Sequence, residues 1–261
     1  MGRMDDMTRQ QTNHVGPVRE RPRGSRARLV VGALMAVALA SAWSIAAPPA
    51  GAQDGGVVAD WRLDERRGST VLVDSSGNGL NGRIGAAVIT EVRLPVGIVH
   101  RFPAVHAPNG RTGHVHTVAD NSLLDPGSGS FGVTVWFRTG RPTQNLVQKG
   151  QSGVAGGYWK MEMESGRARC LFRGSGDAGV ASPRRVDDGA WHELRCVRRD
   201  GRVRMELDGR EVVSTVDDAG VIANTWEVAM GGKSRCDQVR VQCDLFSGDM
   251  NGVRIDHGMV K

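Results

Sequence analysis

Residues 191–215, WHELRCVRRDGRVRMELDGREVVST, carry the clearest structural signal of the chain. Apolar and charged residues alternate through Arg202–Leu207, which is the two-residue period of a strand with one buried and one wet face. Asp200-Gly201 and Asp208-Gly209 interrupt the alternation, and Asp-Gly favours a two-residue primed turn because both positions need positive φ. The stretch therefore predicts three antiparallel strands joined by two tight hairpins.

The same pattern continues into the preceding residues. Ser165-Gly166 separates Trp159–Glu164 from Arg167–Arg173, which predicts another hairpin. No segment has a sustained helical apolar period, and the abundant glycine suits many short strands joined by turns. Residues 53–261 are long enough for one sandwich core and too short for two comfortable domains. We therefore expect an all-β protein with an antiparallel β-sandwich.

The N-terminal segment has the pattern of an export signal. Residues 1–28 carry seven arginines against three acidic residues, and an apolar run follows from Leu29 to Ala47. Ala50-Gly51-Ala52 then supplies a small-x-small cleavage pattern. We expect a signal peptide over residues 1–52 and a secreted domain over residues 53–261. The alternative is an uncleaved segment that anchors the domain to a membrane.

Most of the positive charge lies in this segment. The whole chain has a formal net charge of +6, of which residues 1–28 hold +4. Residues 53–261 are thus close to neutral, at +2. A high isoelectric point alone would suggest a nucleic-acid partner, but this distribution does not support one.

Four cysteines remain in the exported part: Cys170, Cys196, Cys236 and Cys243. An even number of cysteines in an exported chain predicts disulfides. Strand geometry favours Cys170–Cys196, facing each other across neighbouring strands of the meander, together with Cys236–Cys243. A zinc site is the alternative, but the Cys-x-x-Cys spacing and nearby histidines of such sites are absent from the sequence.

Six segments together resemble the laminin-G-like domains of the concanavalin A-like lectin and glucanase superfamily. They comprise a Trp-bearing opening strand, a Gly/Asn turn, an alternating strand, a Gly-x-Trp-His strand, a Leu-x-x-Asp-Gly hairpin and a closing strand. In this order they are Val58–Asp64, Asp74–Gly82, Ser130–Phe137, Asp188–Leu194, Arg204–Val212 and Phe246–Ile255. The closing strand departs from the pattern, because Asn251 and Gly252 stand where an acidic pair is common.

The resemblance implies a jelly-roll fold and a non-catalytic role. Such a domain would recognise a carbohydrate or an extracellular protein through loops at one rim of the sandwich. A structural module of the cell envelope without sugar affinity is the alternative. The resemblance fixes the scaffold, and the function must lie in loops that it does not specify.

Calcium is the cofactor that the sequence suggests. Asp74-x-Ser76-x-Asn78-Gly79 matches the first half of an oxygen-rich calcium loop, but Gly85 at position twelve excludes an EF-hand. Related folds often hold calcium at the sandwich rim, and the resemblance carries this role to Asp74, Asn78 and Asp249. A tight turn with side-chain hydrogen bonds explains the same residues equally well.

Aromatic residues are the usual platforms for sugar rings. The resemblance implies that Trp61, Trp136 and Trp191 are buried, and Trp159 alternates with core methionines. This leaves Tyr158 and Trp226 as the predicted ligand-binding aromatics.

A glycoside hydrolase is the enzymatic alternative, since such enzymes share this fold. Their chemistry needs two carboxylates about 5–10 Å apart, and Glu162 and Glu164 on one strand face come near that range. The related laminarinase-type motif has a middle acid where this chain has Met163. We therefore expect Glu162 and Glu164 to be a solvent-facing pair.

Four histidines, His100, His106, His114 and His116, lie close in sequence. His114 and His116 would share one strand face, and two imidazoles at this spacing could bind a metal. No third ligand follows at a fixed spacing, so we expect these histidines to be polar residues on the surface instead.

Overall fold

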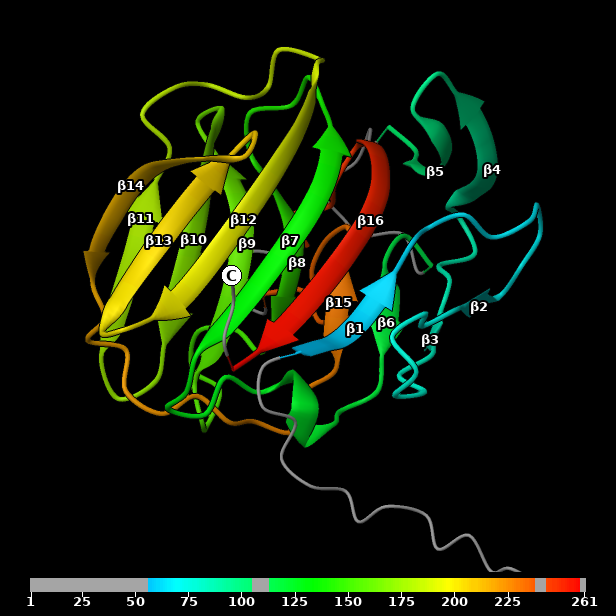
Figure 1. Cartoon of the computed structure of the whole chain (residues 1–261). Helices are drawn as coiled ribbons and strands as arrows, with labels where there is room; N and C mark the ends of the chain where they lie inside the picture. The colour runs from blue at the N-terminus through cyan, green and yellow to red at the C-terminus, as the bar shows by residue number, and fades with distance from the viewer. Residues whose placement is uncertain (1–55, 105–112, 238–242, 259–261) are drawn as a thin grey trace, which may run out of the picture. The chain divides into compact units, whose positions relative to one another are not determined.

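The computed structural model describes residues 56–104, 113–237 and 243–258, within a compact unit formed by Ala50–Lys261. The predicted signal peptide and His106 lie outside these residues. Two antiparallel sheets, which we call sheet A and sheet B, lie face to face, with β14, β13, β12, β7, β16 and β1 of sheet A in front of sheet B in Figure 1. This confirms the predicted all-β jelly-roll sandwich.

Sheet A contains residues 191–215, for which the sequence predicts three strands and two hairpins. Asp200, Gly201, Asp208 and Gly209 all have positive φ, which confirms both primed turns. From one edge to the other, its strands are β14 (Arg210–Val216), β13 (Arg202–Leu207), β12 (Trp191–Arg199), β7 (Phe131–Arg138), β16 (Gly248–His257), β5 (Gly97–Phe102) and β4 (Ile89–Leu94), and β1 (Gly56–Trp61) also pairs with β16.

Sheet B contains the other predicted hairpin, with Ser165 and Gly166 at positive φ in its turn. Its strands are, in order, β11 (Asp177–Ala181), β10 (Arg167–Arg173), β9 (Tyr158–Glu164), β8 (Gln144–Lys149), β15 (Val228–Met230), β6 (His116–Val118), β3 (Gly82–Arg83) and β2 (Val71–Leu72). A short 3₁₀ helix, η1 (Ser122–Leu124), lies between β6 and β7.

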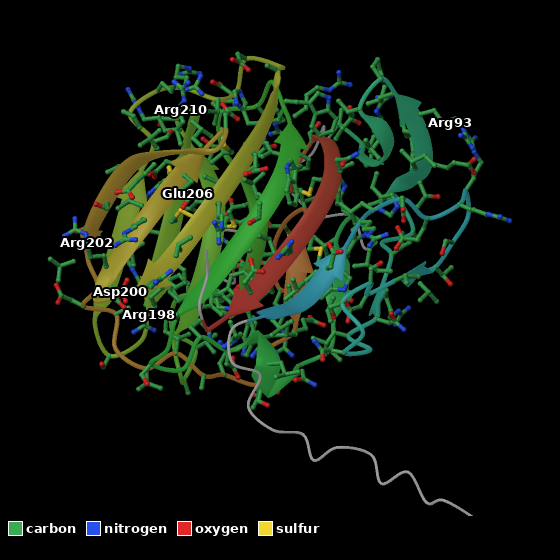
Figure 2. The ribbon with its side chains drawn as sticks, in the orientation of Figure 1. Arg93, Arg198, Asp200, Arg202, Glu206 and Arg210 are labelled. Atoms are coloured by element: carbon green, nitrogen blue, oxygen red, sulfur yellow. A yellow bond between two sulfur atoms is a disulfide. The ribbon has the colours of Figure 1, made fainter. Side chains whose placement is uncertain are left out.

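The core fills the space between the sheets, and two tryptophans dominate it. Trp61 and Trp159 are almost completely buried. Each also satisfies its indole N–H, Trp61 with the Leu80 carbonyl at 2.8 Å and Trp159 with the Leu124 carbonyl at 3.0 Å. The alternation predicted for β13 holds, because Val203, Met205 and Leu207 are buried while Arg202 and Glu206 project from the outer face of sheet A (Figure 2).

The disulfide Cys170–Cys196 confirms the predicted pairing, but the predicted geometry was wrong. Cys170 lies on β10 of sheet B and Cys196 on β12 of sheet A, so the two strands are not neighbours. Both side chains point into the sandwich, and the bond crosses the core between Cα atoms 5.7 Å apart. The disulfide therefore ties the two sheets together.

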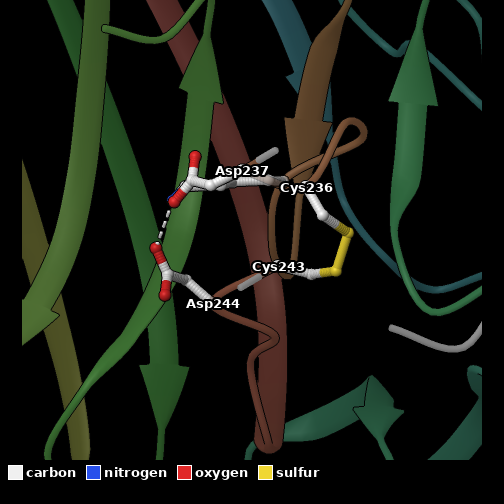
Figure 3. Close-up of a disulfide and its surroundings, with 5 residues drawn as sticks. Cys236, Asp237, Cys243 and Asp244 are labelled. Carbon is white, nitrogen blue, oxygen red and sulfur yellow. Dashed lines mark hydrogen bonds and ion pairs between the residues drawn. A yellow bond between two sulfur atoms is a disulfide. The ribbon is translucent and has the colours of Figure 1, made fainter. Parts of the chain in front are cut away.

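The second predicted pair, Cys236–Cys243, is also present and closes part of the connection between β15 and β16. Lys233 reinforces this closure, because its amide donates to the Cys243 carbonyl at 2.8 Å. Its ammonium pairs with Asp237 and Asp244, each at 2.6 Å, and Figure 3 shows these two carboxylates beside the disulfide.

Candidate functional site

A groove forms on sheet A where two strands share one edge of β16. β5 pairs with β16 through Gly248–Met250, and β1 pairs with the same edge through Val253–His257. Asn251 and Gly252 lie between these two pairings and have no strand partner on this edge, and the register of β16 against β7 shifts at the same place. The opening has a volume of about 350 Å³, within the range of ligand pockets. We call it the Trp136 groove; its lining residues are Asp60, Arg62, Asp64, Val96, Gly97, Ile98, Trp136, Asn251 and Gly252.

Trp136 forms the aromatic wall of this groove. It lies on β7 between the buried residues Val135 and Phe137, so its side chain points to the outer face and is half-buried. Its cross-strand neighbours are Glu193 and Gly252. A Cβ added at Gly252 would lie 3.4 Å from the indole Cε3, so the missing side chain keeps the ring accessible.

The predicted burial of the three strand tryptophans was thus only partly right. Trp61 is fully buried, but Trp136 and Trp191 are half-buried because they occupy outward positions of β7 and β12. The resemblance identified the strands correctly and did not distinguish their two faces.

Polar side chains line the other wall of the groove. Asp60 forms a 3.4 Å ion pair with Arg62, and Asp64 is exposed and has no partner among the described residues. Asn251 donates from Nδ2 to the Ile98 carbonyl at 3.0 Å, which fixes the turn between β4 and β5. An aromatic face beside carboxylate and amide oxygens is a chemistry suited to a sugar ring and its hydroxyl groups.

Asp249, predicted as a calcium ligand, is part of an ion-pair network on sheet A. Its carboxylate binds Arg101 at 2.7 Å and Arg138 at 2.5 Å, and its side chain is almost fully buried. Arg138 also lies over the Trp191 ring, 5.6 Å from the centroid. Asp249 therefore clamps β16 to its two neighbouring strands.

Asp74 and Asn78, the other predicted ligands, cap the outer edge of β1. The Asp74 carboxylate accepts the amides of Asp60, Ser76 and Leu80 at 2.9–3.0 Å and the Ser76 hydroxyl at 2.8 Å. Asn78 donates to the Val58 carbonyl at 3.0 Å. Although burial raises the pKa of Asp74, the hydrogen bonds from these backbone amides lower it overall. The residues thus form the hydrogen-bonded turn that was the alternative to a calcium loop.

The predicted calcium ligands do not converge. Asp74 forms a bridge with Trp61, which lies opposite Val253, and Asp249 is four residues away along β16, about 13 Å at the usual rise per residue. In the described ranges, no group of three or more His, Cys, Asp or Glu residues is placed to hold a metal ion. Calcium binding stays a prediction for experiment.

The predicted ligand-binding aromatics lie elsewhere and are partly covered. Tyr158 begins β9, is 8% exposed, and has Arg173 over its ring at 5.9 Å. Burial raises the pKa of its hydroxyl. Trp226 precedes β15, is half-buried and has Arg235 over its ring at 4.5 Å. Asn224 connects their segments, since it accepts the Trp226 amide and donates to the Gly157 carbonyl, each at 2.9 Å.

Glu162 and Glu164 project from the outer face of β9 and form ion pairs. Glu162 contacts Lys160 at 2.5 Å and Arg169 at 3.5 Å, and Glu164 contacts the same Arg169. Cations thus accompany both carboxylates, but only Glu164 faces solvent, with a side chain 58% exposed against 15% for Glu162.

The predicted location of the histidines on the surface was wrong. His100, His114 and His116 are all buried, at 0–1% exposure. His116 Nε2 lies 3.0 Å from His100 Nδ1, and His100 Nε2 lies 2.9 Å from the Glu65 carboxylate. Burial lowers the pKa of His116 well below its usual value. Glu65, His100 and His116 thus lie in contact inside the protein, because β5 and β6 direct the two imidazoles between the sheets. His114 is separate, and its Nε2 lies 2.6 Å from the Phe246 carbonyl.

A larger cavity of about 550 Å³ lies near β3, β4 and β6. Arg67 and Arg83 are its charged residues, and aliphatic residues, glycines and the hydroxyl-bearing Ser69, Thr70, Thr90 and Thr117 form the rest of the wall. No aromatic or carboxylate side chain of the described residues lines it. The Trp136 groove is therefore the better candidate for sugar recognition.

Sequence reasoning did not identify the Trp136 groove. The one signal was the departure of Asn251 and Gly252 from the acidic pair in the closing strand. These two residues line the groove. Of the described residues, none forms a helix long and apolar enough to cross a membrane.

Comparisons with known proteins agree with this architecture. The Laminin G domain family matches residues 137–258. Human sex hormone-binding globulin is 26% identical over 146 residues, covering 53% of this chain and 35% of that protein. The match thus spans about a third of the curated relative.

Solved structures show the same fold at low sequence identity. The receptor-binding domain of botulinum neurotoxin D matches with a TM-score of 0.58 and 12% identity, covering 78% of this chain and 50% of that one. Domain 4 of AbnA, an extracellular arabinanase from Geobacillus stearothermophilus, matches with a TM-score of 0.53 and 16% identity, covering 79% and 94%.

Proposed function

We propose, starting from the premise that this chain carries a laminin-G-like jelly-roll domain, that it is an exported binding module that recognises a carbohydrate through the Trp136 groove. The observation that carries the proposal is the half-exposed Trp136 indole beside Asp60, Asp64 and Asn251. An aromatic plane with a few convergent polar groups is how proteins orient a small polar ligand.

The scaffold is compatible with this role. The structure of AbnA domain 4 was solved in complex with arabinotriose, and one botulinum neurotoxin binding domain was solved in complex with SialylT. Both likenesses concern the fold, so the identity of the sugar does not transfer to this chain. The proposal rests on the residues of the groove.

Export is part of the proposal. Two disulfides within one small domain are typical of an oxidising compartment, and residues 1–52 have a signal-peptide pattern. An extracellular protein is the alternative partner. A binding role is favoured over hydrolysis because Glu162 and Glu164 are both held in ion pairs.

A glycan array with the oxidised domain tests the proposal, followed by calorimetry on each hit. Trp136→Ala should weaken binding at least tenfold, or about 1.4 kcal/mol. Trp191→Ala is the matched control, since Trp191 is also half-buried on sheet A but does not line the groove. A blank array, or equal binding by Trp136→Ala and the wild type, would refute the proposal. Repeating the titration with EDTA tests the predicted calcium dependence.

A further inference from the structure

Lys149 ends β8 in an unusual position for a lysine. Its cross-strand neighbours are Trp159 and Val228, both core residues, so its side chain enters the space between the sheets. The side chain is 0% exposed. Burying an ammonium group is costly unless its charge is paired and its N–H groups are satisfied.

Oxygen atoms from two loops surround this ammonium. Nζ lies 2.8 Å from Asp120 Oδ1 and 2.6 Å from Asp125 Oδ1. It also donates to the Asn224 carbonyl and lies 3.5 Å from Asn224 Oδ1. We call these four oxygens the Lys149 cage. Two carboxylates with carbonyl and amide oxygens form the donor set that hard divalent cations such as Ca²⁺ prefer.

The charge of the cage suits a divalent cation better than the ammonium. Asp120 and Asp125 contribute two negative charges, and Lys149 balances one of them. Without the ammonium, the cage would keep two unbalanced negative charges.

The cage also organises the rim that carries two predicted ligand-binding aromatics. Asn224 is almost fully buried, and its amide donates to Asp125 at 3.3 Å. Its side chain accepts the Trp226 amide and donates to the Gly157 carbonyl beside Tyr158. The ammonium is therefore at the centre of the contacts that hold these loops in place.

We propose that Lys149 is a built-in cation that occupies a calcium-type site, so that this rim is ordered without any metal ion. The native protein needs no calcium at this position because the ammonium supplies the positive charge. Removing the side chain converts the cage into a site for a divalent cation. This inference is independent of which ligand the Trp136 groove binds.

Thermal unfolding with EDTA or CaCl₂ tests the inference, together with calcium calorimetry. Wild-type protein should show the same Tm in both and no calcium binding at the cage. Lys149→Ala should have a lower Tm in EDTA and recover about 3–6 °C when calcium is at roughly ten times its Kd. Lys149→Met is the matched control, because its long uncharged side chain fills the cage and should give no calcium response.

If Lys149→Ala does not fold in EDTA, refolding from urea with CaCl₂ decides the matter. Recovery of folded protein with calcium, and not with EDTA, supports the inference. Absence of any calcium response in Lys149→Ala, or an equal response in Lys149→Met, overturns it. The inference is also overturned if calcium raises the wild-type Tm and Asp125→Asn abolishes this rise, since the native cage would then hold the ion itself.

Discussion

The Nε2 atom of His116 lies 3.0 Å from the Nδ1 atom of His100, and both imidazole rings are fully buried. The Gly85 amide donates to His116 Nδ1 at 3.1 Å, so His116 carries its proton on Nε2 and donates it to His100. His100 Nε2 then faces Glu65, whose other oxygen accepts the Val73 amide at 2.8 Å. The hydrogen bond from His116 to His100 therefore forms when His116 is neutral.

This arrangement predicts that acid destabilises the fold. Burial, with a smaller effect of the neighbouring histidines, holds the pKa of His116 well below 6.5. Below pH 6.5 the unfolded chain therefore binds a proton that the native protein does not, and stability falls by up to about 1.4 kcal/mol per pH unit. Burial raises the pKa of Glu65, but its hydrogen bonds lower it overall, so further stability is lost as pH falls below 4.5.

Urea unfolding between pH 8 and pH 4 measures this effect. In His116→Asn, the amide oxygen can accept the Gly85 N–H without titrating, so the slope between pH 6.5 and pH 5 should become shallower. A variant profile as steep as that of the wild type would assign the acid sensitivity to other groups.

The disulfides predict unequal losses of stability. Cys170–Cys196 spans 26 residues and Cys236–Cys243 spans 7. Loop-closure entropy gives about 3.5 kcal/mol for the longer loop and about 2.5 kcal/mol for the shorter one. Replacing each pair by alanines and measuring denaturant unfolding should show this order. The inter-sheet pair also leaves a cavity in the core when removed, which should widen the difference. Equal losses would contradict this account.

The turn at Asp74 predicts a loss of stability that calcium does not reverse. Asp74→Ala leaves three backbone amides without their acceptor, while the Ser76 hydroxyl keeps the Val58 carbonyl, and we expect a loss of about 2–3 kcal/mol. Asn78→Ala removes fewer hydrogen bonds and should cost less. Thermal unfolding with and without calcium checks both variants. A wild-type midpoint that rises with calcium, and a variant midpoint that does not, would restore Asp74 as a ligand.

Local sequence was sufficient to predict the hairpins, whereas the pairing of Cys170 with Cys196 was predicted from a strand arrangement that the structure does not have. Asp200-Gly201 and Asp208-Gly209 determine their own turn geometry, because positive φ at two successive residues favours few sequences. The location of Cys170 and Cys196 in different sheets could not be predicted from local sequence, because it depends on which strands pair. Alternation gives the inward face of a strand, but it does not identify the neighbouring strands.

The Trp136 groove could not be predicted from the sequence for the same reason. It exists because β1 and β5, far apart in sequence, meet one edge of β16 on either side of a register shift. Lys149 is a different case, because here the structure explains a residue that does not fit the strand pattern. Its position at an inward site of β8 resembles an error in the alternation, and only the carboxylates brought in by two other loops explain it. Departures from the strand pattern at Lys149 and Gly252 thus mark the two positions of greatest functional interest.

Gly252 provides a test of the groove that leaves Trp136 intact. A Cβ at this position would be 3.4 Å from the Trp136 ring and 3.5 Å from the Trp61 carbonyl, which are ordinary van der Waals contacts. Gly252→Ala should therefore fold and keep most of its sugar binding. Gly252→Leu should place its longer side chain in the groove and reduce affinity at least tenfold, or about 1.4 kcal/mol. Calorimetry with a sugar found by the array measures both variants, and near-ultraviolet circular dichroism verifies the packing. Full affinity in a correctly packed Gly252→Leu would place the sugar site elsewhere, with the rim of Tyr158 and Trp226 as the next region to test.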